Sequence, residues 1–163
     1  MKLIKLSSRK HPGLFAKVDD EDYESLNQFS WYPQKSQHTF YAWASKWIGK
    51  QHIYFSMHRM ILKITDSKLE GDHKNSDGLD NQKDNLRIAT RSQNSSNRQT
   101  VKGSSKYLGV SFDKERKKYR AILKKNYKSY MKRCDTEIEA ALVYNEMAVK
   151  YHGEFARLNV ISD

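Results

Sequence analysis

An acidic residue and a histidine stand side by side at Asp72 and His73, and two asparagines follow at Asn85 and Asn94. A hard divalent cation prefers oxygen ligands, which the Asp72 carboxylate and the Asn94 amide carbonyl can supply alongside water and a phosphate. His73 carries an imidazole that is neutral near pH 7 and able to take a proton from an attacking water. Asn85 can fix the tautomer of that imidazole through its second ring nitrogen. The set indicates metal-assisted phosphodiester hydrolysis.

The sequence around these side chains predicts a strand, a loop, a second strand and a helix, in that order. Turn-forming residues fill positions 76–84, and residues 86–89 alternate as a short strand does. Thr90 then begins a helix, because Gln93 stands three residues later and completes a capping box. In this arrangement the Asp–His pair ends the first strand, and Asn94 lies on the first turns of the helix.

The same stretch resembles the HNH endonucleases, in particular those of the homing type. The matching residues, in order along the chain, are Asp72-His73, Leu79-Asp80-Asn81, Asn85-Leu86-Arg87-Ile88-Ala89-Thr90 and Gln93-Asn94. The resemblance implies a ββα-metal fold (His-Me finger), with His73 as the general base and Asn85 as its orienting partner. It also implies that Asp72 and Asn94 bind one Mg²⁺ or Mn²⁺ ion per active site, and that cleavage leaves 5′-phosphate and 3′-hydroxyl ends.

The composition points to a polyanionic partner. The chain has 163 residues and a formal net charge of +11, with a sequence pI near 9.6 and a mean hydropathy of −0.90. Its basic residues are mixed with aromatic ones, which favours nucleic acid over an anionic membrane. Together with the site above, this predicts double-stranded DNA as the partner and no small-molecule substrate. No long apolar run, signal peptide or lipidation motif is visible. We therefore expect a cytoplasmic protein, in a bacterium or a phage-infected host, that acts on DNA as a monomer or homodimer.

A single cysteine, Cys134, excludes an internal disulfide. It also excludes the zinc-ribbon variants of the HNH fold, because these need several cysteines to bind their structural metal. We expect Cys134 to be a small buried apolar side chain.

Ahead of the Asp–His pair the sequence predicts a small block of strands and helices. The predicted elements are a hairpin over 3–18, a helix over 21–29 capped by Asp19-Asp20, strands over 40–44 and 51–55, and a helix over 57–62. The landmarks VDDEDYE, W, YA and MHR resemble the N-terminal part of the same phage and bacterial HNH proteins. We expect the three tryptophans to pack in the core and on the sheet. His58 is expected to be structural.

The composition changes after Asn94. Residues 95–105 are small, polar and basic, as in a linker that crosses a phosphate backbone. The predicted parts are an HNH domain over 1–100, with a β-rich part at 1–56 and a ββα core at about 57–99, a linker at 101–105, and a second domain at 106–163. A flexible linker would let the two modules bind neighbouring segments of DNA.

The second domain is predicted to contain three strands and a covering helix. The strand-like runs are 107–112, 119–124 and 128–132. Thr136 begins the helix, Glu139 completes its capping box, and Gly153 stands where a helix stops. The residues that recur with helical spacing, and should pack on the sheet, are Ala140, Ala141, Tyr144, Met147, Ala148 and Tyr151.

A helix on one side of such a sheet leaves the other side free. The free side is predicted to carry Arg120, Lys124, Lys128 and Lys132. A twisted basic sheet can enter the major groove of DNA. We therefore expect this face to bind DNA.

The second domain resembles the Apetala-two (ethylene-response-factor) DNA-binding domain, which is also found fused to HNH nucleases. The landmarks are Leu108-Gly109-Val110, Tyr119-Arg120-Ala121, Asp135-Thr136-Glu137, Glu139-Ala140-Ala141, Tyr144, Ala148 and Gly153-Glu154-Phe155-Ala156-Arg157-Leu158-Asn159. The sequence departs from the plant domain at Ser111, Asp113, Ile122 and Cys134. The resemblance implies that the domain docks on DNA as the plant domain does. Because of these departures, it does not imply that the two domains bind the same target sequence.

Together these patterns predict an α+β fold, in which a ββα-metal nuclease domain precedes a three-stranded antiparallel sheet packed on one helix. The residues expected to contact DNA are Arg59, Arg87, Arg91, Arg98, Lys102, Lys106, Arg120, Lys124, Lys128, Tyr130 and Lys132. The leading hypothesis is a metal-dependent DNA endonuclease. One alternative is a DNA-binding regulator with an inactive HNH core. The other is an RNA-binding protein, although no RNA-module signature is visible.

Overall fold

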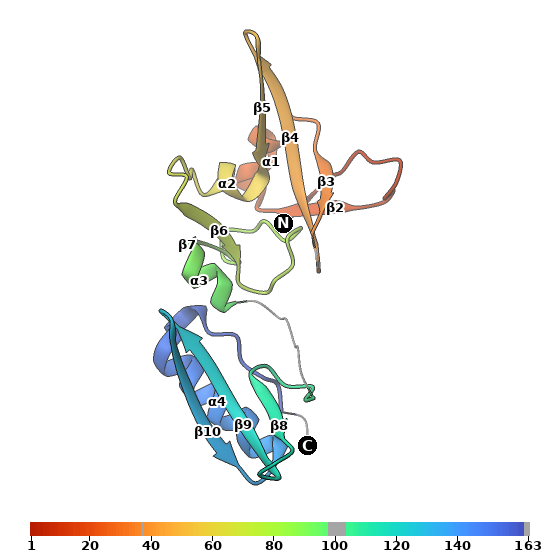
Figure 1. Cartoon of the computed structure of the whole chain (residues 1–163). Coiled ribbons are helices and arrows are strands. Elements are labelled where there is room, and N and C mark those ends of the chain that lie inside the picture. Colours follow the sequence, from red (N-terminus) through yellow and green to blue (C-terminus); the bar gives the residue numbers. More distant parts are fainter. Residues whose placement is uncertain (37, 98–103, 162–163) are drawn as a thin grey trace. The chain divides into compact units, whose positions relative to one another are not determined.

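The chain is described by a computed structural model that covers residues 1–36, 38–97 and 104–161. It divides into two compact units, Met1–Asn94 and Ser95–Asp163 (Figure 1). The predicted boundary was a linker at 101–105, of which 101–103 lie outside the described residues. Ser104 and Ser105 accept hydrogen bonds from the backbone N–H groups of Phe112 and Tyr107, so this end of the predicted linker is bound to the second unit.

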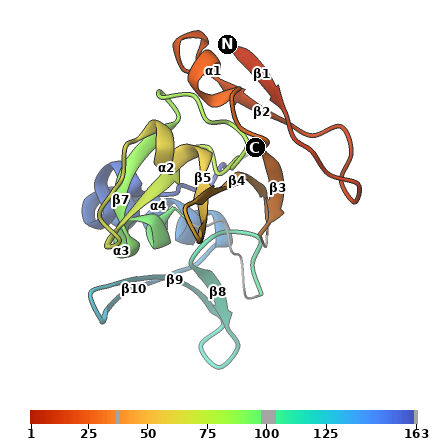
Figure 2. The same ribbon diagram turned by 90° about the horizontal axis from the view of Figure 1, so that it is seen from above.

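The N-terminal unit begins with the block predicted ahead of the Asp–His pair. Its elements are β1 (Lys2–Lys5), β2 (Phe15–Val18), α1 (Asp20–Leu26), β3 (Tyr32–Lys35), β4 (Phe40–Ile48), β5 (Gln51–Ser56) and α2 (Met57–Ile61). Strands β1 and β2 form the predicted hairpin, with α1 beside it (Figure 2). Strand β3, which contains Pro33, was not predicted. It lies at the edge of the sheet β3–β4–β5, where a proline is tolerated.

The core of this unit collects side chains from β1, β2, α1, β4 and α2. Trp31 is its largest member, 1% exposed, and its indole N–H donates to the carbonyl of Leu26 at 2.7 Å. Trp31 therefore packs in the core as predicted. Trp47 does not, because 68% of it is exposed.

The predicted strand–loop–strand–helix is confirmed. β6 (Leu69–His73) pairs antiparallel with β7 (Leu86–Thr90), and α3 (Arg91–Ser96) follows directly (Figure 1). The capping box is present, since Gln93 Oε1 accepts from the N–H of Thr90 at 2.8 Å and Thr90 Oγ1 accepts from the N–H of Gln93 at 3.3 Å. The Asp–His pair therefore ends β6, and Asn94 lies on α3.

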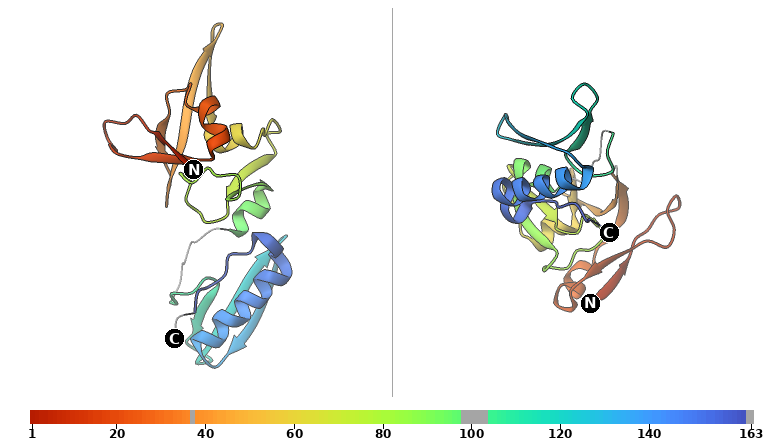
Figure 3. Two further views of the ribbon diagram at one scale, coloured as in Figure 1. Left: turned by 180° about the vertical axis from the view of Figure 1, so that it is seen from behind. Right: turned by 90° about the horizontal axis from the view of Figure 1, so that it is seen from below.

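The second unit is a three-stranded antiparallel sheet covered by one helix. Its elements are β8 (Val110–Asp113), β9 (Lys118–Lys125), β10 (Lys128–Cys134), α4 (Glu137–His152) and the 3₁₀ turn η1 (Gly153–Phe155). Helix α4 lies across one face of the sheet (Figure 3). Thr136 Oγ1 accepts from the N–H of Glu139 at 3.1 Å, and Gly153 ends α4 with a φ of 57°, as predicted.

The predicted apolar stripe packs between α4 and the sheet. Ala140, Ala141 and Ala148 are fully buried. Cys134 is buried in the same cluster, as expected of a small apolar side chain.

Within the described residues, no helix combines the length and apolar character needed to cross a membrane.

The register of the sheet corrects the prediction for its free face. Lys128, Tyr130 and Lys132 do share a face, but Tyr130 pairs with Leu123 and Lys132 with Ala121. Directly paired residues of antiparallel strands point to the same side, and Leu123 and Ala121 are buried. Lys128 and Lys132 therefore lie on the helix-covered side, at the edge strand, and their predicted place on the free face is wrong.

The free face instead carries the alternate residues of each strand. They are Ser111 and Asp113 on β8, Arg120, Ile122 and Lys124 on β9, and Ser129, Met131 and Arg133 on β10. Tyr130 was predicted to contact DNA. In the structure its ring stacks on that of Tyr151 of α4, with ring centroids 3.9 Å apart, so it packs within the second unit.

The turn between β9 and β10 contains a strained tyrosine. Asn126 and Tyr127 both have positive φ, 49° and 61°, which a two-residue hairpin turn requires and which glycine adopts most easily. We expect Tyr127→Gly to raise the free energy of unfolding by about 1 kcal/mol, because a left-handed conformation costs other residues about 1–2 kcal/mol. Urea unfolding measures the gain. Tyr127→Ala is the control, since it removes the ring and keeps the strain; an equal gain in both variants would contradict this explanation.

Candidate active site

The two-stranded ribbon β6–β7 points the Asp–His pair in opposite directions. Side chains alternate along a strand, and the register pairs Asp72 with Arg87 and His73 with Leu86. Asp72 and His73 are each only 4% exposed. Each side of the ribbon therefore has its own partners, the acid side around Asp72 and the imidazole side around His73.

On the acid side, Asp72 forms an ion pair with Arg87. Both Nε and Nη2 of Arg87 lie 2.7 Å from Oδ2 of Asp72, and the Arg87 side chain is 11% exposed. The sequence suggested that Arg87 contacts DNA. In the structure its guanidinium instead neutralises and orients the buried carboxylate, which is the use for which a planar, bidentate cation is suited.

Asn94 reaches the acid side through Glu70. Its Nδ2 donates to Oε2 of Glu70 at 2.6 Å, and Glu70 lies two residues before Asp72 on the same face of β6. Glu70 was not among the predicted site residues, although its spacing from Asp72 in a strand would have revealed it. The acid side thus gathers two carboxylates and an amide, all with oxygen atoms that suit a hard cation.

On the imidazole side, Asn81 is the hydrogen-bonding partner that the structure describes for His73. Asn81 is fully buried, and its Oδ1 lies 3.4 Å from Nε2 of His73. Because Oδ1 can only accept, this contact favours the tautomer that carries the proton on Nε2 and has Nδ1 as the basic nitrogen. Burial lowers the pKa of His73 below its ordinary value of 6.5, and the hydrogen bond to Asn81 and the charge of Asp72 partly oppose the shift.

Asn85 was predicted to orient His73, but its described hydrogen bonds have other partners. Its Oδ1 accepts from the N–H of Asn75 at 3.0 Å, and its Nδ2 donates to the carbonyl of Asp80 at 2.8 Å. Asn85 therefore closes the loop between β6 and β7. Asn85 acts on the His73 imidazole only indirectly, by fixing the conformation of the loop that contains Asn81.

The same loop is held from outside by β2 and the start of α1. The N–H of Asn81 donates to the carbonyl of Lys17 at 2.8 Å, and the N–H of Lys17 donates to the carbonyl of Leu79 at 2.8 Å. Asp19 makes no side-chain cap for α1. Its carboxylate instead accepts from the N–H of Lys83 at 2.8 Å. The N-terminal hairpin thus fixes the loop that positions His73.

A cluster of rings packs against His73. The His58 ring lies 5.1 Å from the His73 ring, and Tyr41 lies 5.6 Å from both. His58 fits there because residue 71 is glycine, since a Cβ at Gly71 would lie 2.5 Å from Cδ2 of His58. Nε2 of His58 is 3.2 Å from Oγ of Ser56. The predicted structural role of His58 agrees with this packing.

The burial of His58 makes the N-terminal unit sensitive to acid. Burial lowers the pKa of His58 from 6.5 to about 3, and the neighbouring His73 and Arg59 add to the shift. Between these values the unfolded chain binds more protons than the folded one. The free energy of unfolding is therefore unaffected above pH 6.5 and falls as the pH drops from 6.5 toward 3.

We expect this histidine to contribute a slope of up to about 1.4 kcal/mol per pH unit over that range. Urea unfolding at a series of pH values measures the slope, which should be shallower in His58→Gln. His52→Gln is the control, because it removes an exposed histidine. A slope that is identical in wild type and His58→Gln would contradict the prediction.

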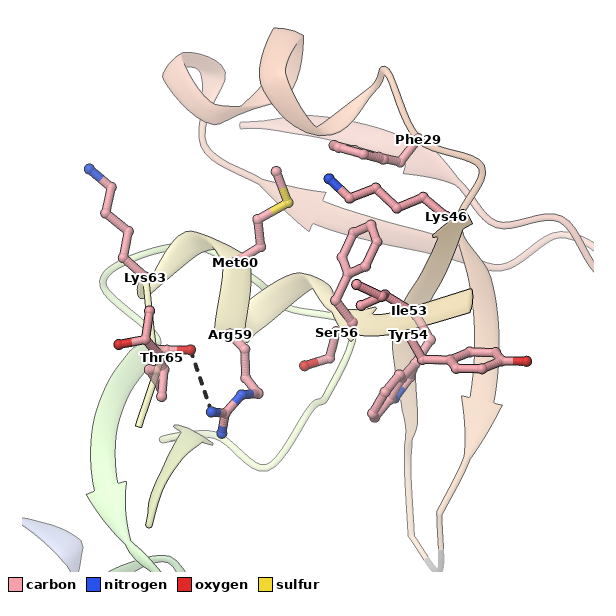
Figure 4. Close-up of a pocket in the computed structure, with 12 residues that line it drawn as sticks. Phe29, Lys46, Ile53, Tyr54, Ser56, Arg59, Met60, Lys63 and Thr65 are labelled. Carbon is pink, nitrogen blue, oxygen red and sulfur yellow. Dashed lines mark hydrogen bonds between the residues drawn. The ribbon is translucent and has the colours of Figure 1, made fainter. Parts of the chain in front are cut away.

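Arg59 was predicted to reach DNA, and the structure gives it a local role. Its Nη1 donates to the carbonyl of Leu69 at 2.6 Å, and its Nη2 to the carbonyl of Asp66 at 3.0 Å and, as Figure 4 shows, to that of Ile64. These bonds fasten the segment between α2 and β6. Arg59 therefore fixes the start of the strand that carries Asp72 and His73.

The remaining residues predicted to contact DNA are distributed over both units. Arg91 is exposed on α3, and Lys106 is exposed with its ammonium 5.1 Å from the ring centroid of Tyr107. Arg120 and Lys124 lie on the free face of the second unit. Arg98 and Lys102 lie outside the described residues. For these residues DNA contact stays a prediction.

Comparison with known proteins identifies the family to which this chain belongs. No protein-family model matches the chain, and no solved structure matches it either. A protein of Acanthamoeba polyphaga mimivirus, described as an uncharacterised HNH endonuclease, is 33% identical over 151 residues, which span 91% of this chain and 76% of the viral protein. The chain therefore belongs to the HNH endonuclease family and is a nuclease.

Proposed function

We propose that this nuclease hydrolyses phosphodiester bonds of double-stranded DNA with the help of one Mg²⁺ or Mn²⁺ ion. The observation that carries the proposal is the arrangement at the end of β6. Asp72 and His73 are buried at consecutive positions of the strand, on opposite sides of the ribbon, and Asn94 joins the Asp72 face through Glu70. We take β6, β7 and α3 to be the ββα-metal finger of the family.

The acid side fits a divalent ion of this kind. Asp72 and Asn94 would hold it through a carboxylate and an amide oxygen, with Glu70 beside them. No group of three or more His, Cys, Asp or Glu side chains suited to a metal occurs in the described part of the chain. Mg²⁺ needs no such group, because it keeps several waters and binds through one or two carboxylates plus substrate phosphates. The ion would neutralise negative charge that develops on the phosphate and the leaving oxygen.

His73 supplies the base. With Nε2–H directed to Asn81, the basic Nδ1 can accept a proton from a water molecule that attacks the phosphorus. The new bond forms between the water oxygen and phosphorus as the bond from phosphorus to O3′ breaks in line. O3′ takes a proton from a solvent water as it leaves, so the products are a 5′-phosphate and a 3′-hydroxyl. Burial keeps the imidazole neutral at pH 7 and so ready to act as a base.

The second unit is proposed to bind the DNA. It contains 15 of the Lys and Arg residues and eight Asp and Glu residues, a formal charge of +7, and its sheet-and-helix architecture agrees with the Apetala-two resemblance. Asp113 is the acidic residue of the free face. Its Oδ2 lies 3.6–4.0 Å from guanidinium nitrogens of Arg116, Arg120 and Arg133, which holds the three arginines near one point of the face.

One active site per chain makes a single nick the natural product of a monomer, and the family resemblance suggests a homing-type role.

Supercoiled plasmid tests the proposed chemistry. Wild-type protein in Mg²⁺ or Mn²⁺ is expected to convert it to the nicked or linear form, with ends that accept ligation, and excess EDTA is expected to stop the reaction. Undiminished cutting in EDTA would contradict metal dependence. Tight, salt-sensitive binding without any cutting in either metal would instead support a DNA-binding regulator.

The two sides of the second unit's sheet offer a matched pair of double variants. We expect Arg120→Ala with Lys124→Ala to weaken DNA binding and to lower the salt slope by about 0.9 for each phosphate that the protein no longer neutralises. Lys128→Ala with Lys132→Ala removes the same charge from the other side of the sheet and should change the slope less. Fluorescence anisotropy over a salt titration measures both. Equal slopes in the two double variants would contradict DNA contact by the free face.

A further inference from the structure

The hairpin β4–β5 presents aromatic rings to solvent. Trp47 is 68% exposed and Tyr54 is 58% exposed, and His52 between them is also exposed. The Trp47 and His52 rings are stacked, with centroids 4.6 Å apart and planes 10° from parallel, and Tyr54 lies 4.6 Å from His52. We propose that this aromatic ladder, Trp47, His52 and Tyr54, binds an unpaired base of the DNA substrate.

The ladder is separate from the core. Trp47 pairs with His52, and Tyr54 pairs with Ser45, so all three rings lie on one face of the hairpin. The neighbouring positions, such as Ala44, point to the opposite face, where Ala44 is 1% exposed. Large rings in solvent lose the stabilisation that burial gives. The core therefore does not account for the ladder. The stacked pair of Trp47 and His52 stabilises the pairing of β4 with β5, but it leaves most of the Trp47 ring exposed to solvent.

The charge around the ladder identifies the kind of partner. Between residues 25 and 65 the chain contains no Asp or Glu, and it contains Lys35, Lys46, Lys50, Arg59 and Lys63. A second copy of the chain would bring the same positive charge to such an interface. A polyanion is complementary to it. Aromatic rings among basic residues are the combination with which proteins bind nucleic-acid strands, since each base can stack on a ring whatever its sequence.

A groove along β5 extends this surface. It measures about 550 Å³, and its lining includes Trp43, Tyr54, Lys46 and Lys63 (Figure 4). Tyr54 thus belongs both to the ladder and to the groove. The volume lies within the range of roughly 300–1,000 Å³ that small-ligand sites occupy. The groove gives a base stacked on the ladder an adjacent cavity. Lys46 lies on the face opposite the ladder, with its ammonium 6.0 Å from the ring centroids of Phe29 and Phe55, so Lys63 is the ammonium group of the groove that we assign to the phosphates of the same strand.

The ladder also lies on the element that leads to the active site. Strand β5 ends at Ser56, which contacts His58, and the His58 ring packs on that of His73. A DNA strand held on the hairpin would therefore be held by the unit that contains the catalytic imidazole. This inference rests on the proposed DNA substrate and adds a contact for bases that are out of the duplex.

Anisotropy with a short labelled oligodeoxythymidylate, in EDTA, tests the inference without cleavage. We expect Trp47→Ala to weaken binding about tenfold, because one base stacked on one ring contributes on that order. Trp47→Phe should retain most of the affinity, because phenylalanine still offers a ring. Ile48→Ala is the matched control, since Ile48 is the next residue, 53% exposed, and points to the other face.

Equal affinity of Trp47→Ala and Ile48→Ala would overturn the inference, and so would a change in self-association, seen by sedimentation, without a change in DNA affinity. Plasmid cutting by the wild-type protein is scored separately. If the wild type cuts in Mg²⁺ and Trp47→Ala still binds the oligonucleotide normally, the ladder inference fails and the proposed function stands. If Trp47→Ala loses binding but the wild type never cuts, the reverse holds.

Discussion

Replacing His73 by alanine is expected to slow DNA nicking by about 10²–10⁴-fold, the range that a positioned general base contributes. The variant should still bind DNA, because the proposed binding surfaces and the acid side of the β6–β7 ribbon are intact. Initial rates of plasmid nicking at saturating protein, with Mg²⁺ present, measure the loss. Alanine leaves Oδ1 of Asn81 without the imidazole that it contacts in the wild type, so folding is checked by circular dichroism.

His38→Ala is the matched control for this experiment. His38 is an exposed histidine in the turn before β4, far along the chain from the Asp–His pair, and its loss should not change the rate. A His73→Ala variant that is folded and nicks at the wild-type rate would contradict the role of His73 as the base. Loss of cutting in both variants would indicate an effect of the substitutions unrelated to the imidazole at the end of β6.

The second large effect is expected at Arg87. Replacing it by methionine should destabilise the N-terminal unit by about 3–5 kcal/mol, because the Asp72 carboxylate would then be buried without its cation. Urea unfolding followed by circular dichroism measures the change. Adding Asp72→Asn to the same chain removes the unpaired charge and should recover part of the stability. The single variant Asp72→Asn completes the double-mutant cycle.

This cycle also separates the two roles considered for Arg87. A residue that contacts DNA would lose affinity on substitution and leave the unfolding free energy unchanged. The contact of two Arg87 nitrogens with one oxygen of Asp72, a residue that is 4% exposed, instead predicts a lower unfolding free energy and unchanged DNA affinity. Wild-type stability in Arg87→Met, together with weakened DNA binding, would return Arg87 to the DNA surface and remove it from the acid side.

Local sequence signals predicted the elements of this fold well. The capping boxes at Thr90 with Gln93 and at Thr136 with Glu139 mark the starts of α3 and α4, because they depend only on residues three apart. The glycine at the end of α4 is equally local. Spacing within one strand also predicted correctly that Lys128, Tyr130 and Lys132 share a face.

Relations between elements were harder to predict, since they depend on register and on loop conformation. Which side of β10 faces the helix depends on its pairing with β9, and a shift of one residue reverses every side chain. The partner of His73 depends on how the loop folds, and the loop offers several asparagines of similar chemistry. Asn81 is distinguished only by its burial, which no local pattern reveals. The acid-side role of Arg87 likewise follows from its position opposite Asp72 across the ribbon.

The central claim is that one cation lies between Asp72, Asn94 and the scissile phosphate at the end of β6, where His73 activates the attacking water. A crystal of the His73→Ala variant with uncut duplex DNA and Mn²⁺ tests it directly, through the anomalous signal of the metal. The expected peak lies about 2.0–2.2 Å from an oxygen of Asp72 and from the Asn94 carbonyl oxygen, as is usual for small divalent ions. A peak bound by other side chains, or DNA seated with its backbone away from the end of β6, would contradict the account.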